Sequence, residues 1–228
     1  MKLIHIAIDG PVASGKGSVA RGLSKALGIP CLDTGALYRG IAVHVRDNSP
    51  SYNEGVAPHS GDGVGADFLK DIKMTAKIVD GVTRVSLGGV DVTTRLRDNE
   101  ISKISGGGLA SIPQVRAFCT KISQDIARST SLIAEGRDIC NVVLPDAKHK
   151  FFLTAKPKVR AMRRYKELTA KGQDIAFKQV FKETKARDKM DYKRNLKNIK
   201  NVVFIDSTNM TIDETVKHML NIIDGKEK

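Results

Sequence analysis

The chain alternates between short apolar runs and segments whose apolar residues recur at helical spacing. Residues 2–8, KLIHIAI, are apolar and β-branched, and residues 18–28, SVARGLSKALG, have helical spacing that ends at a glycine. IPCL at 29–32 leads in the same way into DTGALYRGIAVHV at 33–45. Later apolar runs that precede helical patterns are SLIAEG at 131–136, HKFFLTA at 149–155 and NVVFIDS at 201–207. This order predicts an α/β fold, a parallel sheet covered by helices with right-handed crossovers.

The middle of the chain departs from this alternation. Residues 48–65, NSPSYNEGVAPHSGDGVG, are rich in Gly, Pro and Ser, which favours a mobile connection. Residues 72–93 then alternate polar and apolar around the pairs Asp80-Gly81 and Gly88-Gly89, as in a small antiparallel meander. We expect residues 66–96 to form an inserted β subdomain.

Length and cysteine content limit the class of protein. With 228 residues, 41% of them hydrophobic, the chain can bury a real core as one domain with an insertion or as two small domains. Cys31, Cys119 and Cys140 are widely spaced and lack metal-ligand neighbours, so we expect neither disulfides nor zinc, and a reducing cytoplasm as the setting. The first apolar run ends at Asp9 and Gly10, too early for a signal peptide or a membrane span.

The net charge of +13 would by itself favour nucleic acid or acidic lipid as a partner. The charge is concentrated, however, because residues 156–200 contain sixteen Lys or Arg against five Asp or Glu. Aromatic residues are too scattered to stack the bases of a single strand. The distribution favours a polyphosphate ligand, and we expect no nucleic-acid and no membrane partner.

Residues 10–18, GPVASGKGS, have the pattern of a phosphate-binding loop. Gly10 and Gly15 frame four residues before Lys16, so backbone N–H groups and the start of the next helix can surround a phosphate, while Lys16 reaches its oxygens. Such a loop can also be a simple tight turn, but its place between a strand and a helix favours nucleotide binding. The residues assigned to nucleotide binding are Gly10, Pro11, Val12, Ala13, Ser14, Gly15, Lys16, Gly17 and Ser18.

Gly17 is unusual, because Ser or Thr commonly follows the lysine of such loops. Ser18 supplies a hydroxyl one residue later and is our candidate ligand for Mg²⁺. The sequence GKGS resembles the loops of nucleoside monophosphate kinases.

Polar side chains also follow two other predicted strands. Thr34 and Arg39 come after IPCL. Glu135 lies near the end of SLIAEG, and Arg137 and Asp138 follow it. Ligands of open α/β sheets bind at the carboxyl ends of strands, where the two arginines could clamp one phosphate. A lone Arg-Asp pair is more often a surface salt bridge, but the nearby phosphate loop favours the clamp.

Several segments together carry a resemblance to one family. IDGPVASGKGS, LDTGALYR, VDVTTRLRDNEIS, IPQVR, AEGRDICNVVLPDA and RDKMDYKR occur in order over almost the whole chain, which resembles the cytidylate kinases of the bacterial type. The resemblance implies a P-loop kinase core over residues 1–228 with a parallel five-stranded sheet, the β insert at 66–96 beside the monophosphate, and a helical lid at 156–190 over ATP. It implies Mg-assisted phosphorylation of CMP and dCMP by ATP.

The resemblance also assigns roles to acceptor residues. It implies that Arg39, Arg137 and Arg194 hold the CMP phosphate, that Asp191 with Arg187 meets the ribose hydroxyls, that Arg116 with Asp138 reads the base, and that Thr34 belongs to the substrate site. Three features depart from the family. Gly107 replaces a base-contacting Ser, so Ser105 or a backbone group must substitute or the contact is lost; Cys140 replaces a usual Gly; and the loop at 48–65 has no clear counterpart.

Arg160, Arg163 and Arg164 share one face of a predicted helix. They could form a solvated helix face, but a hairpin of two arginine-bearing helices joined near Gly172 could close over the phosphates and exclude water. We therefore assign them, with Lys16, to catalysis by positioning and charge neutralisation. Glu135 either holds a metal-bound water or braces Lys16.

Two other functions stay open. The chain could phosphorylate another small acceptor, such as UMP, AMP or a hydroxylated metabolite, or it could be a nucleic-acid-binding ATPase that uses its basic segment as a track. We expect a cytoplasmic monomer.

Overall fold

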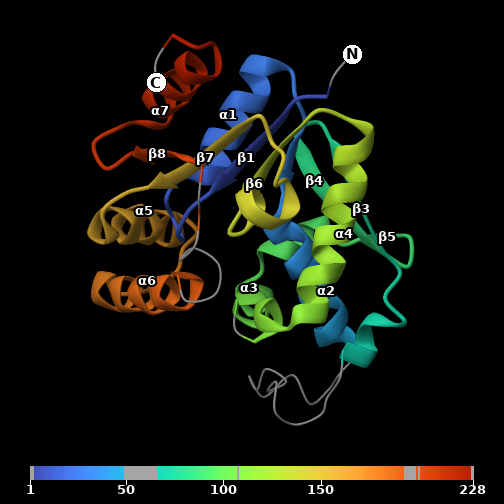
Figure 1. Ribbon diagram of the computed structural model, residues 1–228. Helices are drawn as coiled ribbons and strands as arrows, with labels where there is room; N and C mark the ends of the chain where they lie inside the picture. The colour runs from blue at the N-terminus through green and yellow to red at the C-terminus, as the bar shows by residue number, and fades with distance from the viewer. Residues whose placement is uncertain (1–2, 49–65, 107, 193–198, 200, 227–228) are drawn as a thin grey trace. The chain divides into compact units, whose positions relative to one another are not determined.

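A computed structural model describes residues 3–48, 66–106, 108–192, 199 and 201–226. The chain divides into two compact units, one of residues 1–29 and 131–228 and the other of residues 30–130 (Figure 1). The loop predicted at 48–65 lies outside the described residues except for Asn48.

The main sheet has five strands, which confirms the predicted α/β fold, and their order is β2-β6-β1-β7-β8. Its strands are β1 (His5–Asp9), β2 (Cys31–Asp33), β6 (Leu132–Gly136), β7 (His149–Thr154) and β8 (Val203–Asp206). β1 runs parallel to both β6 and β7, and β7 runs parallel to β8. Asp9, the last residue of β1, is paired with Gly136 of β6 and Phe152 of β7. The segments that follow β1 and β6 therefore begin side by side, which positions the candidate site.

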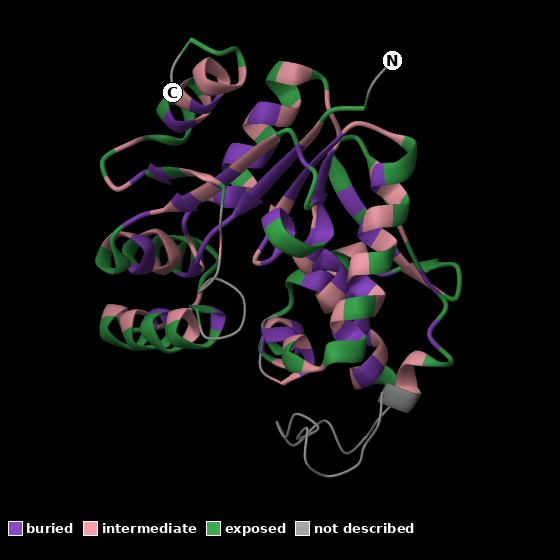
Figure 2. Cartoon of the chain, in the orientation of Figure 1, coloured by how far each residue is buried: buried purple, intermediate pink, exposed green. Residues whose placement is uncertain are grey.

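Apolar strands and amphipathic helices form the core of the unit that contains β1. Figure 2 shows the buried central strands, where Ile6, Ala7 and Ile8 of β1 are fully enclosed. The helices of this unit are α1 (Lys16–Leu27), α5 (Pro157–Ala170), α6 (Phe177–Asp191) and α7 (Ile212–Ile223). α7 begins with a capping box between Thr211 and Glu214.

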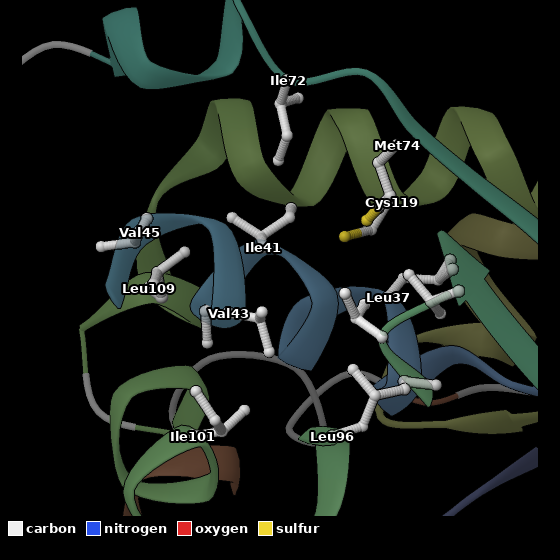
Figure 3. Close-up of a cluster of buried hydrophobic side chains, with 14 of the residues drawn as sticks. Leu37, Ile41, Val43, Val45, Ile72, Met74, Leu96, Ile101, Leu109 and Cys119 are labelled. Carbon is white, nitrogen blue, oxygen red and sulfur yellow. The ribbon is translucent and has the colours of Figure 1, made fainter. Parts of the chain in front are cut away.

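The unit of residues 30–130 has its own core around α2 (Thr34–Asn48) (Figure 3). The antiparallel sheet predicted within 66–96 is confirmed: β3 (Met74–Val79), β4 (Val82–Leu87) and β5 (Val90–Asp91) pair in that order. Its two turns are the predicted pairs, and all four of their residues have positive φ. Gly40 of α2 allows this sheet to approach, because a Cβ there would lie 2.7 Å from Val85 Cγ1.

Helices complete this second core. They are α3 (Asn99–Gly106) and α4 (Pro113–Ser129), with short turns η2 (Ala66–Leu69), η3 (Thr93–Arg97) and η4 (Leu109–Ser111). The β insert thus belongs to a larger unit than residues 66–96, and its separate boundary stays a prediction. Among the described helices, none is long and apolar enough to cross a bilayer.

Candidate active site

The loop between β1 and α1 has a backbone that only particular residues allow. Gly10 has φ 153°, and a Cβ at this position would lie 2.0 Å from the carbonyl oxygen of Leu153 in β7. Gly15, with φ 95°, leads into α1. Ala13 has φ 57°, a left-handed conformation that costs free energy for any residue except glycine. The surrounding contacts must therefore hold Ala13 in place.

Lys16 is buried at the start of α1. Its Nζ donates to the carbonyl of Pro11 at 2.9 Å and to Ser14 Oγ at 3.4 Å. Burial, helped by the nearby Arg137 cation, lowers the pKa of Lys16 to about 7, although Glu135, Asp9 and Asp191 act in the opposite direction. An anion that entered the loop would stabilise the charged form of this side chain.

Two arginines of α5 also donate to loop carbonyls. Arg160 Nη1 donates to the carbonyl of Val12 at 2.9 Å, and Arg163 Nη1 reaches the carbonyl of Ser14 at 3.5 Å. Arg163 also donates to the Ser207 carbonyl at 2.7 Å, and its burial lowers its pKa. Arg164 instead donates to Glu167 on its own helix at 2.8 Å. Of the three arginines predicted to share a face, Arg160 and Arg163 therefore contact the loop, and Arg164 pairs with a residue of its own helix.

The end of β6 limits the space at position 17. A Cβ at Gly17 would lie 3.3 Å from Glu135 Oε1 and 3.4 Å from Arg21 Nη1, both at the ends of side chains. A larger residue at position 17 would therefore make tight contacts with these two side chains. Ser18 carries the hydroxyl instead, is exposed, and accepts from Arg21 Nη2 at 3.3 Å.

Arg137, just after β6, pairs with Asp191 at the end of α6. Arg137 Nε donates to Asp191 Oδ2 at 2.7 Å, and Arg187 Nε lies 3.6 Å from the other oxygen of Asp191. Burial by itself would lower the pKa of Arg137, but the Asp191 carboxylate, with Glu135 and Asp9, raises it. The structure thus brings together Arg137, Arg187 and Asp191.

A π-helical turn, η5 (Ile139–Val143), follows Arg137 and Asp138. Asp9 is fully buried and anchors this turn, because its two carboxylate oxygens accept the backbone N–H groups of Ile139 and Cys140, each at 2.9 Å. Burial raises the pKa of Asp9, against the effect of these hydrogen bonds and of Lys16. The thiol of Cys140 packs between strands, toward the carbonyls of Ala7 and Phe151, and its burial raises its pKa.

Comparison with known proteins identifies the family. A sequence profile of the cytidylate kinase family matches residues 6–225. The chain belongs to the cytidylate kinase family. A cytidylate kinase from Thermosipho melanesiensis is 39% identical over 227 residues, 98% of each chain. Those of Caldicellulosiruptor saccharolyticus and Neisseria meningitidis serogroup A are each 38% identical, and the match covers 97% and 95% of this chain and 96% and 95% of theirs.

Solved kinase structures resemble the chain more distantly. Shikimate kinase from Bacteroides thetaiotaomicron matches with a TM-score of 0.49 and 9% identity, over 98% of this chain and 99% of that one. Shikimate kinase from Acinetobacter baumannii gives 0.46 and 13%, over 99% and 96%. The family assignment rests on the sequence matches and not on these likenesses.

Three further residues that the sequence assigns to the substrate site, Thr34, Arg39 and Arg116, lie in the unit of residues 30–130. Arg39 Nη2 donates to Asp33 Oδ2 at 2.6 Å, and Gly35 leaves room for this pair. Arg39 Nε is buried and has no hydrogen-bond partner among the described residues. This buried N–H group is therefore unsatisfied among the described residues. Thr34 is buried at the first position of α2.

The base-reading residues are less completely described. Arg116 Nη1 donates to the carbonyl of Ala110 at 3.4 Å, and Ser105 Oγ donates to the carbonyl of Ser102 at 3.3 Å. Asp138 is buried just before η5. Gly107 and Arg194 lie outside the described residues.

Sequence reasoning missed Asp9, Asp188 and Ser207. The signal for Asp9 was present, since a lone acid ends the apolar β1 strand. Asp188 had a weaker signal, as an acid within a basic segment. Nothing in the sequence pointed to Ser207, because its contacts to Arg163 depend on the packing of β8 and α5.

Proposed function

We propose that the chain transfers the γ-phosphoryl group of ATP to the 5′-phosphate of CMP or dCMP and forms ADP and the pyrimidine nucleoside diphosphate. The observation that carries this proposal is the buried Lys16 inside a complete phosphate loop, in a member of the cytidylate kinase family. The acceptor phosphate is already an anion, so the reaction needs no strong base. Positioning and charge neutralisation must supply the rate enhancement.

In the proposed reaction the phosphate loop and the cations near it interact with the negative charge of the ATP phosphates. Backbone N–H groups of the loop, from residues other than Pro11, and the start of α1 hold the ATP phosphates. Lys16 sits on the transferring group, and Arg163 and Arg164 neutralise charge when the α5–α6 hairpin, the predicted lid of residues 156–190, closes. The contacts of Arg160 do not favour this role, because its guanidinium donates to the carbonyls of Ala155 and Val12 and to Asp188.

The oxygen donors around Gly17 fit Mg²⁺. The Ser18 hydroxyl is exposed at the start of α1, and the Glu135 carboxylate lies against Gly17. Mg²⁺ prefers such oxygen ligands together with phosphate oxygens, and when bound it would neutralise charge on the ATP phosphates. Ser18 and Glu135 are the residues that would hold it, with Glu135 also stabilising the charged form of Lys16.

The acceptor residues keep the roles that the family implies. Arg39, Arg137 and Arg194 hold the CMP phosphate, and the free Nε of Arg39 supports this assignment. Asp191 already accepts from Arg137, yet a carboxylate has lone pairs left for ribose hydroxyls. Arg116 and Asp138 read the cytosine, and Thr34 completes the set. We expect the enzyme to act as a monomer in the cytoplasm.

A coupled assay of ADP formation over a panel of acceptors tests the proposal. Purified protein with MgATP is offered CMP, dCMP, UMP, AMP and no acceptor, and kcat/KM is measured for each. CMP and dCMP should exceed UMP and AMP by roughly tenfold or more, given about 1–3 kcal/mol for one base-edge contact. A clear preference for UMP or AMP would replace the assignment with another monophosphate kinase.

A further inference from the structure

A well-enclosed ion pair in the unit of residues 1–29 and 131–228 joins Arg160 of α5 to Asp188 of α6. Arg160 Nη1 and Nη2 donate to the two carboxylate oxygens of Asp188 at 2.8 and 2.6 Å, a bidentate arrangement. The side chain of Arg160 is 4% exposed and that of Asp188 is 23% exposed. A buried guanidinium needs such a partner, because an unpaired charge in this position would be strongly unfavourable.

The same guanidinium holds two backbone carbonyls. Its Nε donates to Ala155 at the end of β7, at 2.8 Å, and its Nη1 donates to Val12 of the phosphate loop, at 2.9 Å. Arg160 is therefore fixed by Ala155 and Asp188 and in turn fixes the carbonyl of Val12. A side chain with these bonds has few donors left for a phosphate.

Holding the Val12 carbonyl determines the direction of the next N–H group. A trans peptide is planar, and its C=O and N–H point in opposite directions. The N–H of Ala13 must therefore point away from Arg160. Ala13 is also the residue of the loop that has φ 57° without being glycine, so its conformation depends on such external contacts.

We propose that Asp188 is a positioning residue for nucleotide binding: through Arg160 it fixes the Val12–Ala13 peptide so that the Ala13 N–H is presented to the phosphates of the nucleotide. This rests on the proposed function only in taking the loop ligand to be ATP or ADP. Asp188 and Asp191 lie one turn apart on α6, but Asp191 pairs with Arg137 and Arg187 instead. The two acids thus serve different substrates, Asp188 the ATP side and Asp191 the acceptor side.

The test compares direct binding of ADP and of CMP by calorimetry in five variants, the last of which is Asp188→Glu. Asp188→Asn removes the charge at nearly constant shape, and Arg160→Lys keeps the charge but cannot bond Ala155, Val12 and Asp188 together. The third variant combines the two, and the fourth, Glu183→Gln, makes the same type of change at an exposed acid of α6 as a matched control.

Asp188→Asn should weaken ADP binding by roughly tenfold or more, as expected when a buried charge loses its partner, while CMP binding without ADP changes by less than about twofold. Arg160→Lys should also weaken ADP binding. The double variant should bind ADP no more than about twofold more weakly than whichever single variant binds it less tightly, because both changes break one chain of contacts. Asp188→Glu keeps a carboxylate and should bind ADP with an affinity within about threefold of the wild type. Glu183→Gln should bind both ligands like the wild type.

Three results would overturn the inference: equal losses of ADP and CMP affinity, which indicate a general disturbance of α6; losses that multiply in the double variant; or unchanged ADP affinity in folded Asp188→Asn. If Asp188→Asn does not fold, Arg160→Lys decides: it should still weaken ADP binding and leave CMP binding within about twofold, and equal losses or an unchanged ADP affinity would overturn the inference. If the wild-type protein does not phosphorylate CMP, the proposed reaction is wrong. The comparison of ADP affinities among the variants would still test the role of Asp188.

Discussion

Three cations of the candidate site, Lys16, Arg160 and Arg163, contact carbonyl oxygens of the phosphate loop. Their acceptors are Pro11, Val12 and Ser14 respectively. Because each carbonyl points toward a cation, the following N–H groups point the other way, as donors for an anion. Individual side chains thus determine the shape of a loop whose sequence alone shows only its glycines and its lysine.

The lowered pKa of Lys16 makes nucleotide binding dependent on pH. In the free protein Lys16 has a pKa of about 7, so it is mostly neutral at pH 8 and mostly charged at pH 6. Bound phosphates favour the charged form and raise this pKa, so binding takes up a proton above pH 7 and affinity falls as the pH rises.

Calorimetry of ADP binding without Mg²⁺, in buffers of different ionisation enthalpy, measures this proton directly. We expect uptake of close to one proton at pH 8 and much less at pH 6. Lys16→Met lacks the titrating group, so any binding that remains should proceed without this uptake. Equal proton uptake at both pH values would contradict the assignment.

Gly10 is required by a close backbone approach. A Cβ there would lie 2.0 Å from the Leu153 carbonyl oxygen, whereas at Gly28, with φ 66°, no atom lies within 4 Å. Gly28→Ala should therefore cost only about 1–2 kcal/mol, from its left-handed conformation. Gly10→Ala should cost more than about 3 kcal/mol and also weaken ADP binding. Urea unfolding of both variants measures the difference, and equal losses would argue against the contact.

We predict that the choice of base depends on Asp138. Cytosine presents an amino donor where uracil presents a carbonyl acceptor, so a carboxylate favours CMP and repels UMP. Asn has nearly the same shape but can turn its amide to donate. Asp138→Asn should lower the CMP-to-UMP ratio of kcat/KM by roughly tenfold or more, given about 1–3 kcal/mol for a base-edge contact.

Overall activity of Asp138→Asn should fall as well, because the residue is buried next to Arg137. The ratio is therefore the informative quantity, measured with a melting curve to establish folding. An unchanged ratio in a folded variant would show that Arg116, Ser105 or a backbone group reads the base.

At the scale of elements, the sequence predicted most of what the structure contains. Apolar runs located all five parallel strands, and turn pairs located the antiparallel sheet, because both signals are local. The contacts of Asp9 with η5 and of Asp188 with Arg160 were not predictable, since each joins residues far apart in the chain. Gly17 was visible in the sequence as a departure from the common loop pattern, but its closeness to Glu135 could be seen only in the structure.

The pairing of α1 with α7 depends on Gly22. A Cβ there would lie 2.6 Å from Val216 Cγ2, so the glycine permits close approach of the two helices. Alanine has the higher helix propensity by about 1 kcal/mol, but overpacking costs about 1–3 kcal/mol. Gly22→Ala should therefore lower the free energy of unfolding.

A second substitution separates these two effects. In the Val216→Ala background the obstructing methyl groups are absent, so Gly22→Ala should become neutral or stabilising there. Urea unfolding of both single variants and the double variant gives the coupling free energy. Strict additivity would mean that Val216 does not limit the approach of the helices.

At the scale of the whole molecule, the residues assigned to the acceptor are divided between the two units. Thr34, Arg39 and Arg116 belong to residues 30–130, while Arg137, Asp138, Arg187 and Asp191 belong to the other unit. Part of the positive charge of residues 156–200 also has a local role, since Arg160 and Arg163 donate to backbone carbonyls. Net charge is therefore a poor guide to the partner of this protein.

A CMP kinase and a nucleic-acid-dependent ATPase should differ in how their ATP consumption depends on CMP and on nucleic acid. ATP consumption should be slow without CMP, because the arginines assigned to the transferring group are expected to be fully recruited only when both substrates are bound. Addition of CMP should raise the rate by roughly a hundredfold or more, since a charge placed on the transition state contributes several kcal/mol. Single- or double-stranded DNA or RNA should leave the rate unchanged at any salt concentration. Measuring ADP release with and without CMP, nucleic acid and added salt tests both expectations, and a rate that nucleic acid stimulates and salt suppresses would favour the ATPase.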